Sequence, residues 1–173
     1  MTVIDVRTPG EFASGHVPGA RNVPLDRLEE AMPALEAAAA RGPLLVVCAS
    51  GARSGRACEA LTAAGITAVA TMTGGTTAWA AEGHDLKRPE GGRAVWPMER
   101  QVRLAAGGLV LLGVGVAQVW APAQWLAAGV GAGLAFSAVS GTCGMAALLA
   151  RLPHNRRAGN GEDFDRTLND LHR

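Results

Sequence analysis

The feature that most limits how this chain can fold is a run of 47 residues, 104 to 150, without any Asp, Glu, Lys, Arg or His. As a helix rising about 1.5 Å per residue it would be about 70 Å long, enough to cross a hydrocarbon layer about 30 Å thick twice. Pro122 interrupts the run between Trp120 and Trp125, and tryptophan is typical of membrane surfaces. We therefore expect a transmembrane helical hairpin: an anchor over 100–155, with helices over 102–120 and 125–152.

The residues that flank the hairpin predict its orientation. Arg100 and Arg103 precede the first predicted helix, and Arg151, Arg156 and Arg157 follow the second, while the connecting segment carries no charge. Because positively charged flanks favour the cytoplasmic side, we expect both ends in the cytoplasm. The alternative is a buried hairpin in a soluble protein, but a domain this small could not cover two helices that are apolar all round.

Small residues recur at every fourth position of the second predicted helix, at Gly129, Gly133, Ser137 and Gly141. Such a face lets another helix approach closely. Its partner is either the first helix or a second copy of the chain, so both intrachain packing and a homodimer stay open. Cys143 lies on the same helix and is expected to be a packing residue, because a thiol in lipid stays protonated.

The first 99 residues differ in composition, with 9 Lys and Arg against 11 Asp and Glu, so we expect a domain boundary near residue 100. Short apolar segments alternate there with helical patterns. This alternation is typical of an α/β domain with a mostly parallel sheet flanked by helices. The predicted strands are 3–6, 20–24, 44–47 and 69–72, and the predicted helices are 11–14, 26–40, 54–64 and 76–81.

One predicted strand, Leu44 to Val47, ends on a cysteine. Ligands of parallel sheets bind beyond the carboxyl ends of strands, which is where Cys48 lies. The small residues that follow let backbone N–H groups turn inward around the sulfur, and the next helix and Arg53 add positive charge. We therefore predict that Cys48 is a nucleophile at neutral pH, held by a loop of Ala49, Ser50, Gly51, Ala52, Arg53 and Ser54.

For most other residues near this loop we expect structural roles. Arg53 either binds an anionic donor or braces the loop against an acid such as Glu11 or Asp5. Asp5 and Arg7 are expected to be scaffolding, and His16 a loop organiser rather than a base. Cys58, inside the next helix, is expected to pack rather than to react, because helix geometry holds it away from the loop.

Composition excludes several other classes of function. The net charge is +1 and the basic residues are scattered without aromatic neighbours, which argues against a nucleic-acid partner. The three cysteines have neither metal-ligand spacing nor a disulfide framework, which argues against a structural zinc site and against a secreted disulfide scaffold. The N-terminal sequence has no signal segment, which favours a cytoplasmic first domain.

Three stretches in order resemble the signatures of a single-domain rhodanese, a sulfurtransferase family. They are DVRTPGEFASGHVPGARNVPL (Asp5 to Leu25), VVCASGARS (Val46 to Ser54) and GGTTAWAAEGH (Gly74 to His84). WPMERQVRLAAGGLVLLG (Trp96 to Gly113) and FSAVSGTCGMAALLARLPHN (Phe136 to Asn155) resemble the two-helix anchor of YgaP-like rhodaneses of the bacterial inner membrane. The resemblance covers nearly the whole chain.

The resemblance implies a membrane-anchored sulfurtransferase that works through a persulfide on Cys48. The donor would be thiosulfate or a persulfide, the acceptor cyanide or a thiol, and no cofactor or metal would take part. The related phosphatases have five residues between Cys and Arg, whereas Cys48 and Arg53 are separated by four, so a smaller group than phosphate is expected. An alternative function is a membrane-tethered carrier or sensor of persulfide or nitrosothiol groups with little multiple turnover.

The resemblance also divides the chain into segments. We expect a rhodanese-like domain over 1–85, a linker with an interfacial turn over 86–99, the anchor over 100–155 and a cytoplasmic tail over 156–173. Rhodanese domains usually have a strand and a helix before the IDVR stretch, so an N-terminal truncation with a missing edge strand is an open alternative. Phe164, Leu168 and Leu171 share one face of a short helix in the tail, which is either a docking helix or a solvated end.

Overall fold

The computed structural model describes residues 1–88, 96–140, 144–152, 155 and 161–173. The chain divides into two compact units, which are described separately. The first combines Met1–Val95 with Pro153–Arg173, and the second is Trp96–Leu152.

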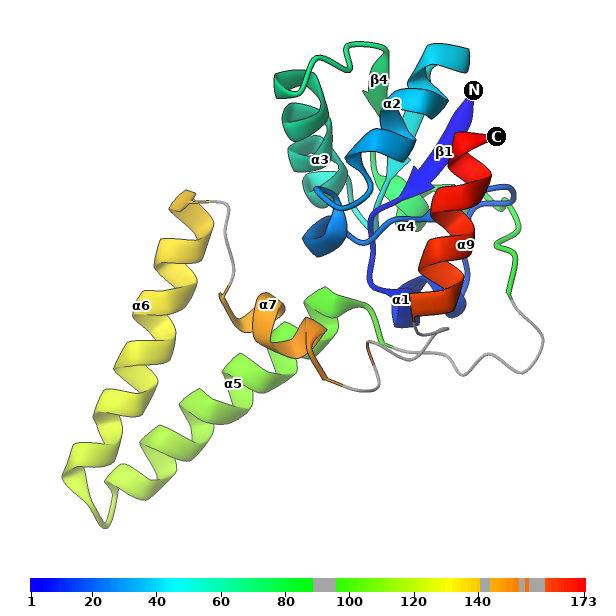
Figure 1. The fold of residues 1–173 in the computed structure, drawn as a ribbon. Helices are drawn as coiled ribbons and strands as arrows, with labels where there is room; N and C mark the ends of the chain where they lie inside the picture. The colour runs from blue at the N-terminus through cyan, green and yellow to red at the C-terminus, as the bar shows by residue number, and fades with distance from the viewer. Residues whose placement is uncertain (89–95, 141–143, 153–154, 156–160) are drawn as a thin grey trace. The chain divides into compact units, whose positions relative to one another are not determined.

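A four-stranded parallel sheet organises the first unit, in the order β2-β1-β3-β4, and Figure 1 labels its strands β1 and β4. Its strands are β1 (Thr2–Asp5), β2 (Arg21–Asn22), β3 (Leu44–Val47) and β4 (Val69–Thr71). The α/β class with a parallel sheet is therefore confirmed. Asp5 and Val47 are paired in the register of β1 and β3, so the two central strands end side by side. Cys48 follows directly at this edge.

Helices lie between the strands, as the alternating pattern predicts. They are α1 (Pro9–Ala13), the 3-10 helix η1 (Leu25–Arg27), α2 (Met32–Arg41), α3 (Ala52–Ala63) and α4 (Gly75–Ala81). The prediction of one helix over 26–40 is wrong, because η1 ends at Arg27 and α2 starts at Met32. Pro33 explains the break, since proline fits the first turn of a helix but would clash with the preceding turn inside one.

The core of the first unit includes residues from the end of the chain. Ile4, Val46, Leu35 and Leu61 bring β1, β3, α2 and α3 together, and all four are fully buried. The helix α9 (Gly161–His172) adds its apolar face to this same cluster. Of the two alternatives for the tail, the structure supports the docking helix, so this folded unit extends beyond the predicted 1–85.

Residues just before the anchor also belong to the first unit. The backbone groups of His16 and Lys87 exchange hydrogen bonds of 2.9 and 2.8 Å, and Arg88 Nε donates to the Ser14 carbonyl at 3.1 Å. The predicted linker over 86–99 therefore starts as a packed segment. Its central part, 89–95, lies outside the described residues.

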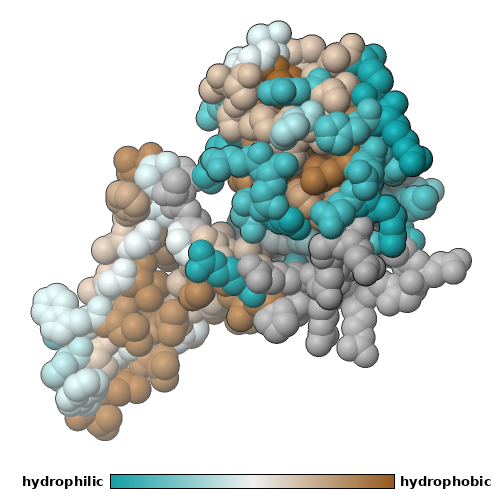
Figure 2. Space-filling view, in the orientation of Figure 1, coloured by the Kyte–Doolittle hydropathy of each residue, from teal (hydrophilic) through white to brown (hydrophobic). Residues whose placement is uncertain are grey.

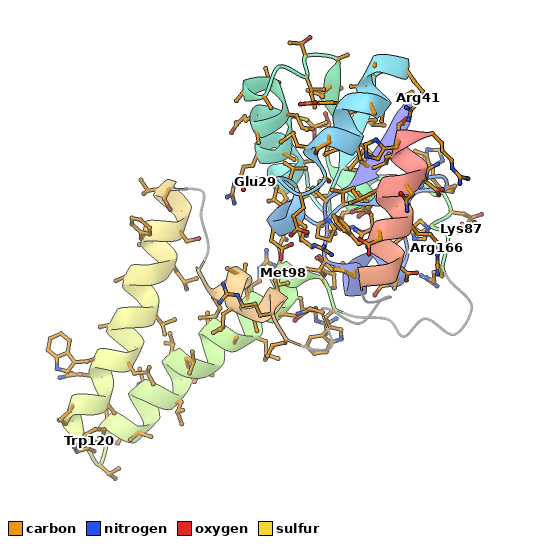
Figure 3. The ribbon with its side chains drawn as sticks, in the orientation of Figure 1. Glu29, Arg41, Lys87, Met98, Trp120 and Arg166 are labelled. Carbon is orange, nitrogen blue, oxygen red and sulfur yellow. The ribbon has the colours of Figure 1, made fainter. Side chains whose placement is uncertain are left out.

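The second unit contains two helices long and apolar enough to cross a membrane. They are α5 (Met98–Ala117) and a helical segment formed by η2 (Ala121–Ala123) and α6 (Gln124–Ser140). Large apolar side chains are exposed along both, and Figure 2 shows the apolar surface that they form. Trp120 lies at the turn between them (Figure 3). The prediction of a hairpin of apolar helices is confirmed.

Two details of this hairpin differ from the expectation. The helix α5 starts at Met98, so Arg100 and Arg103 lie in its first turns rather than before it. The prediction of one helix over 125–152 is wrong: α6 ends at Ser140, and α7 (Gly144–Ala150) is a separate helix that contacts α5. Residues 141–143, between these two helices, lie outside the described residues.

The close approach of α5 and α6 uses Gly113, not the predicted stripe of small residues. A Cβ on Gly113 would lie 3.0 Å from the Ala127 backbone nitrogen and 3.2 Å from the Ala123 carbonyl oxygen. At Gly129 and Gly133, a Cβ would have no neighbour within 4 Å among the described residues, and Gly141 lies outside them. Pairing of two copies through this stripe stays a prediction.

Candidate active site

Cys48 lies at the carboxyl end of β3, with a side chain that is 1% exposed. Helix α3 starts at Ala52, two residues before the predicted Ser54, so Ala52, Arg53 and Ser54 form its first turn. The connection between strand and helix is therefore only Cys48 to Gly51. A turn this short keeps the unpaired N–H groups of the helix start close to the sulfur.

The donors to the Cys48 sulfur include one backbone N–H group and one hydroxyl. The Gly51 backbone N–H lies 3.1 Å from Sγ, and the Ser54 hydroxyl lies 3.5 Å from it. Gly51 has φ +105°, a conformation that favours glycine and that lets its N–H point back toward the sulfur. The loop predicted around Cys48 is therefore formed by Gly51, whose φ is positive, and by the first turn of α3.

These hydrogen bonds decide the ionisation of Cys48. Burial by itself raises the pKa of a thiol, and it is the largest single influence on this one. Hydrogen bonds from the Ser54 hydroxyl and from the backbone of Ser54, Gly51 and Ser50 favour the thiolate, and together they outweigh burial. The pKa of Cys48 is therefore lowered, as a nucleophilic cysteine requires.

The Ser54 hydroxyl has a further partner that the sequence did not reveal. Its oxygen lies 2.5 Å from the Thr71 hydroxyl oxygen, at the end of β4, and 3.0 Å from the Gly51 carbonyl. A serine hydroxyl has one proton, so it can donate to one acceptor at a time. When it donates to the sulfur, Thr71 is the group placed to donate to Ser54.

Arg53 is held by Glu11 through two parallel hydrogen bonds. Its two terminal nitrogens donate to the Glu11 carboxylate oxygens at 2.8 and 2.9 Å, and Glu11 is 2% exposed. The same carboxylate accepts hydrogen bonds from the Thr8 N–H and hydroxyl, and the Glu11 N–H donates to the Thr8 hydroxyl oxygen, which completes the capping box of α1. Of the two candidate roles for Arg53, the geometry favours bracing, with Glu11 as the acid.

The first turn of α4 packs against the loop that holds Cys48. Thr76 and Thr77 donate backbone hydrogen bonds to the carbonyls of Cys48 and Ala49, at 2.8 and 3.1 Å. Gly75 has φ +57°, and a Cβ there would lie 2.3 Å from the Cys48 carbonyl oxygen. Gly75 is therefore required for the contact. The GGTTAWAAEGH stretch was recognised in the sequence, but its function as a support for the loop was not.

The remaining polar residues near the sheet edge have structural roles. Arg7 forms an ion pair with Asp5 at 2.7 Å and donates to the Gly15 carbonyl at 2.8 Å. His16 stacks on Phe12 with ring centroids 3.7 Å apart, and its Nδ1 lies 3.0 Å from the Phe12 carbonyl. Burial lowers the pKa of His16, which favours a neutral ring. These contacts agree with the predicted scaffolding.

The second thiol of the first unit has a different environment. Cys58 is half-buried in α3 beside the core, and burial, followed by the charge of Glu59, raises its pKa. A raised pKa agrees with the predicted packing role. Cys143 lies outside the described residues.

Within the described ranges, no group of three or more His, Cys, Asp and Glu is arranged to hold a metal ion.

A cysteine held by a tight amide loop at the end of a parallel sheet is the arrangement expected of a rhodanese-like domain. The family described as rhodanese-like domain matches residues 1–82, and the family described as inner membrane protein YgaP-like, transmembrane domain, matches residues 95–158. The chain therefore belongs to the rhodanese family, in the form in which a rhodanese-like domain is followed by a YgaP-like transmembrane domain.

Relatives extend this assignment over most of the chain. An uncharacterized protein of Synechocystis, slr1261, is 38% identical over 158 residues, which cover 90% of this chain and 85% of the relative. A sulfurtransferase of Allochromatium vinosum is 35% identical over 91 residues, covering 53% of this chain and 82% of the relative. Thiosulfate sulfurtransferase 16 of Arabidopsis thaliana is 40% identical over 89 residues, covering 46% and 74%.

Solved structures of rhodanese-like proteins also match. A rhodanese-related protein of Thermoplasma volcanium is 33% identical, with a TM-score of 0.46 over 51% of this chain and 84% of that one. A rhodanese-like domain protein of Staphylococcus aureus is 32% identical, with a TM-score of 0.45 over 51% and 81%.

Proposed function

We propose that this protein is a membrane-anchored thiosulfate sulfurtransferase that carries sulfur on Cys48. The observation that carries the proposal is the Cys48 sulfur, buried and hydrogen-bonded by Gly51 N–H and the Ser54 hydroxyl. Such donors stabilise a negative charge on sulfur, whether it is the thiolate or the persulfide that follows. Membership of a sulfurtransferase family supports the same chemistry.

The reaction proceeds in two transfers of a sulfur atom. The Cys48 thiolate attacks the outer sulfur of thiosulfate, a sulfur–sulfur bond forms, and sulfite leaves with the electron pair of the broken bond. Cys48 then holds a persulfide with a negative terminal sulfur. Cyanide or a thiolate attacks that sulfur, takes it as thiocyanate or a new persulfide, and returns Cys48 to the thiolate.

The environment of Cys48 fits small sulfur groups better than phosphate. Four residues separate Cys48 from Arg53, one fewer than in the related phosphatases, and the Arg53 terminal nitrogens bind Glu11. The loop amides are therefore the main donors to an anion in this site. The lowered pKa of Cys48 provides the thiolate without a neighbouring base.

The proposal includes the place of the reaction in the cell. The two candidate spans anchor the enzyme in the bacterial inner membrane, and the basic residues at both ends of the hairpin favour a cytoplasmic first domain. Persulfide transfer would then take place next to the membrane surface. A carrier of persulfide or nitrosothiol groups with little multiple turnover is the alternative function.

Turnover by the purified full-length protein in detergent tests the proposal. Wild type should convert thiosulfate and cyanide to thiocyanate over many cycles, Cys48→Ser should lose this activity, and Cys143→Ser should keep it. A stable persulfide on Cys48 with a single slow turnover would favour the carrier. Absence of both thiocyanate and a Cys48 persulfide would contradict the proposal.

A further inference from the structure

Helix α9 packs into the sulfurtransferase domain although it follows the membrane hairpin in the sequence. Leu171 is 1% exposed and Phe164 is 7% exposed, and both belong to the core cluster that contains Leu28 and Leu35. Leu168 packs against the same cluster. The helix lies against α2 and the edge strand β2 (Figure 1). Its apolar face therefore has an intramolecular partner.

Three arginines of the first domain contact α9. The Arg27 guanidinium lies 3.6 Å from the centre of the Phe164 ring, and Arg21 forms an ion pair of 2.9 Å with Asp170. Arg41, labelled in Figure 3, donates to the carbonyls of Leu171 and His172 at the end of the helix. Arg41 thus caps carbonyl groups that have no partner within α9. Contacts hold both ends of the helix.

We infer that α9 is a permanent part of the catalytic domain, which is therefore built from two segments separated by the membrane hairpin. The residues before α5 and those after α7 must then lie on the same side of the membrane, whichever side that is. This conclusion follows from packing and is independent of the arginine counts that predict orientation. It also does not rest on the proposed sulfurtransferase activity.

The inference couples folding of the domain to completion of the hairpin. An isolated helix of 12 residues is marginally stable in water, so α9 needs its apolar face covered. Without α9, the core cluster that contains Leu28 and Leu35 would in turn lose Phe164 and Leu171. The domain can therefore reach its final packing only after the hairpin has been made and α9 has followed it.

Hydrogen–deuterium exchange of the full-length protein in detergent tests the docking. In Leu171→Asp, the amides of α2 (Met32–Arg41) should lose protection at least tenfold, because a carboxylate cannot be buried in this cluster. Asn169→Asp places the same charge on the exposed face of α9 and should leave α2 unchanged. Unchanged protection of α2 in Leu171→Asp would overturn the inference.

Crosslinking shows whether α9 docks on its own chain. Arg21→Cys/Asp170→Cys, in a background with Cys48→Ser, Cys58→Ser and Cys143→Ser, should react with a short bis-maleimide to give a crosslinked monomer. Crosslinked dimers would mean that α9 comes from a second copy, which contradicts the intramolecular arrangement. Lack of any crosslink, with both cysteines labelled by a monofunctional maleimide, would contradict docking.

Sidedness is tested in vesicles of known orientation. Single cysteines introduced by Glu59→Cys in α3 and Asn169→Cys in α9, in the same background, should react with a membrane-impermeant maleimide from the same side. Reaction from opposite sides would overturn the inference even if the enzyme remained active.

Discussion

At the scale of single residues, the chemistry of Cys48 depends on a balance between burial and hydrogen bonding. Burial raises its pKa, and the Ser54 hydroxyl with the loop N–H groups lowers it further than burial raises it. Ser54 in turn contacts Thr71 from a different strand. Thr71 is therefore a positioning residue, since it acts on the sulfur through Ser54.

Removal of the Thr71 hydroxyl should make Cys48 a weaker nucleophile. Thr71→Val deletes the donor that lets Ser54 direct its proton to the sulfur, so the pKa of Cys48 should rise. Alkylation of Cys48 at neutral pH should slow by roughly twofold to fivefold, the effect of weakening one hydrogen bond in a chain. Thr71→Ser should restore the rate, and Thr73→Val serves as the control. An unchanged rate in Thr71→Val would show that Ser54 acts without it.

At the scale of elements, the active-site loop is fixed by contacts from both sides. Glu11 in α1 binds Arg53 at the start of α3, and the first turn of α4 donates to the carbonyls of Cys48 and Ala49. The helices α1 and α4 lie far from Cys48 in the sequence, and Glu11 and Arg53 are 42 positions apart. The geometry of the loop therefore depends on the tertiary structure.

Breaking the Glu11–Arg53 pair should destabilise the domain more than it changes the chemistry. Glu11→Gln leaves a partly buried guanidinium without its carboxylate, which costs about 3 kcal/mol in comparable pairs. We expect a lower urea midpoint of unfolding, followed by circular dichroism, whereas Glu59→Gln on the exposed surface of α3 should have little effect. Equal midpoints for the two variants would contradict the bracing role.

Gly75 should tolerate no side chain, in contrast to Gly55. Gly75→Ala combines a strained φ with a Cβ 2.3 Å from the Cys48 carbonyl oxygen, so we expect a loss of at least about 2 kcal/mol of stability. In α3, a Cβ on Gly55 would have no neighbour within 4 Å among the described residues, and Gly55→Ala should stabilise by about 0.5–1 kcal/mol. Thermal unfolding compares the two, and similar shifts would refute the contact.

The sequence predicted those parts of the site that are close together along the chain. The strand Leu44–Val47, the nucleophile and its loop could be read from one stretch, because local pattern and glycine placement determine them. Glu11 was named as one of two acids for Arg53, but nothing local selected it over Asp5. Thr71 and Gly75 were missed as partners of the loop, because their roles arise when β4 pairs with β3.

At the scale of the whole molecule, the chain alternates between two environments. The chain first forms the sheet of the first unit, enters the second unit at Trp96, and returns to the first unit with α9. The composition change near residue 100 predicted the first boundary. For the second boundary, the anchor was expected to end at residue 155, but docking of the tail was only one of two alternatives, since a short amphipathic helix can either dock or remain solvated.

The hairpin should depend on Gly113 and not on its neighbour Gly115. Gly113→Leu would push α5 away from Ala127, whereas a Cβ on Gly115 would have no neighbour within 4 Å in the described part of the chain. We expect Gly113→Leu to lower the thermal stability of the helices in detergent, measured by circular dichroism, and Gly115→Leu to leave it nearly unchanged. A reversed order would contradict the packing of α5 on α6.

The most direct test of the central claim is the pH dependence of alkylation at Cys48 in the full-length protein, followed by mass spectrometry of each cysteine. The rate follows the thiolate fraction, so it rises with pH through the pKa. We predict a midpoint for Cys48 below that of an unperturbed thiol, about 8.5, and a midpoint for Cys58 above it. Ser54→Ala should move the Cys48 midpoint upward. A Cys48 midpoint at or above that of an ordinary thiol would contradict the account.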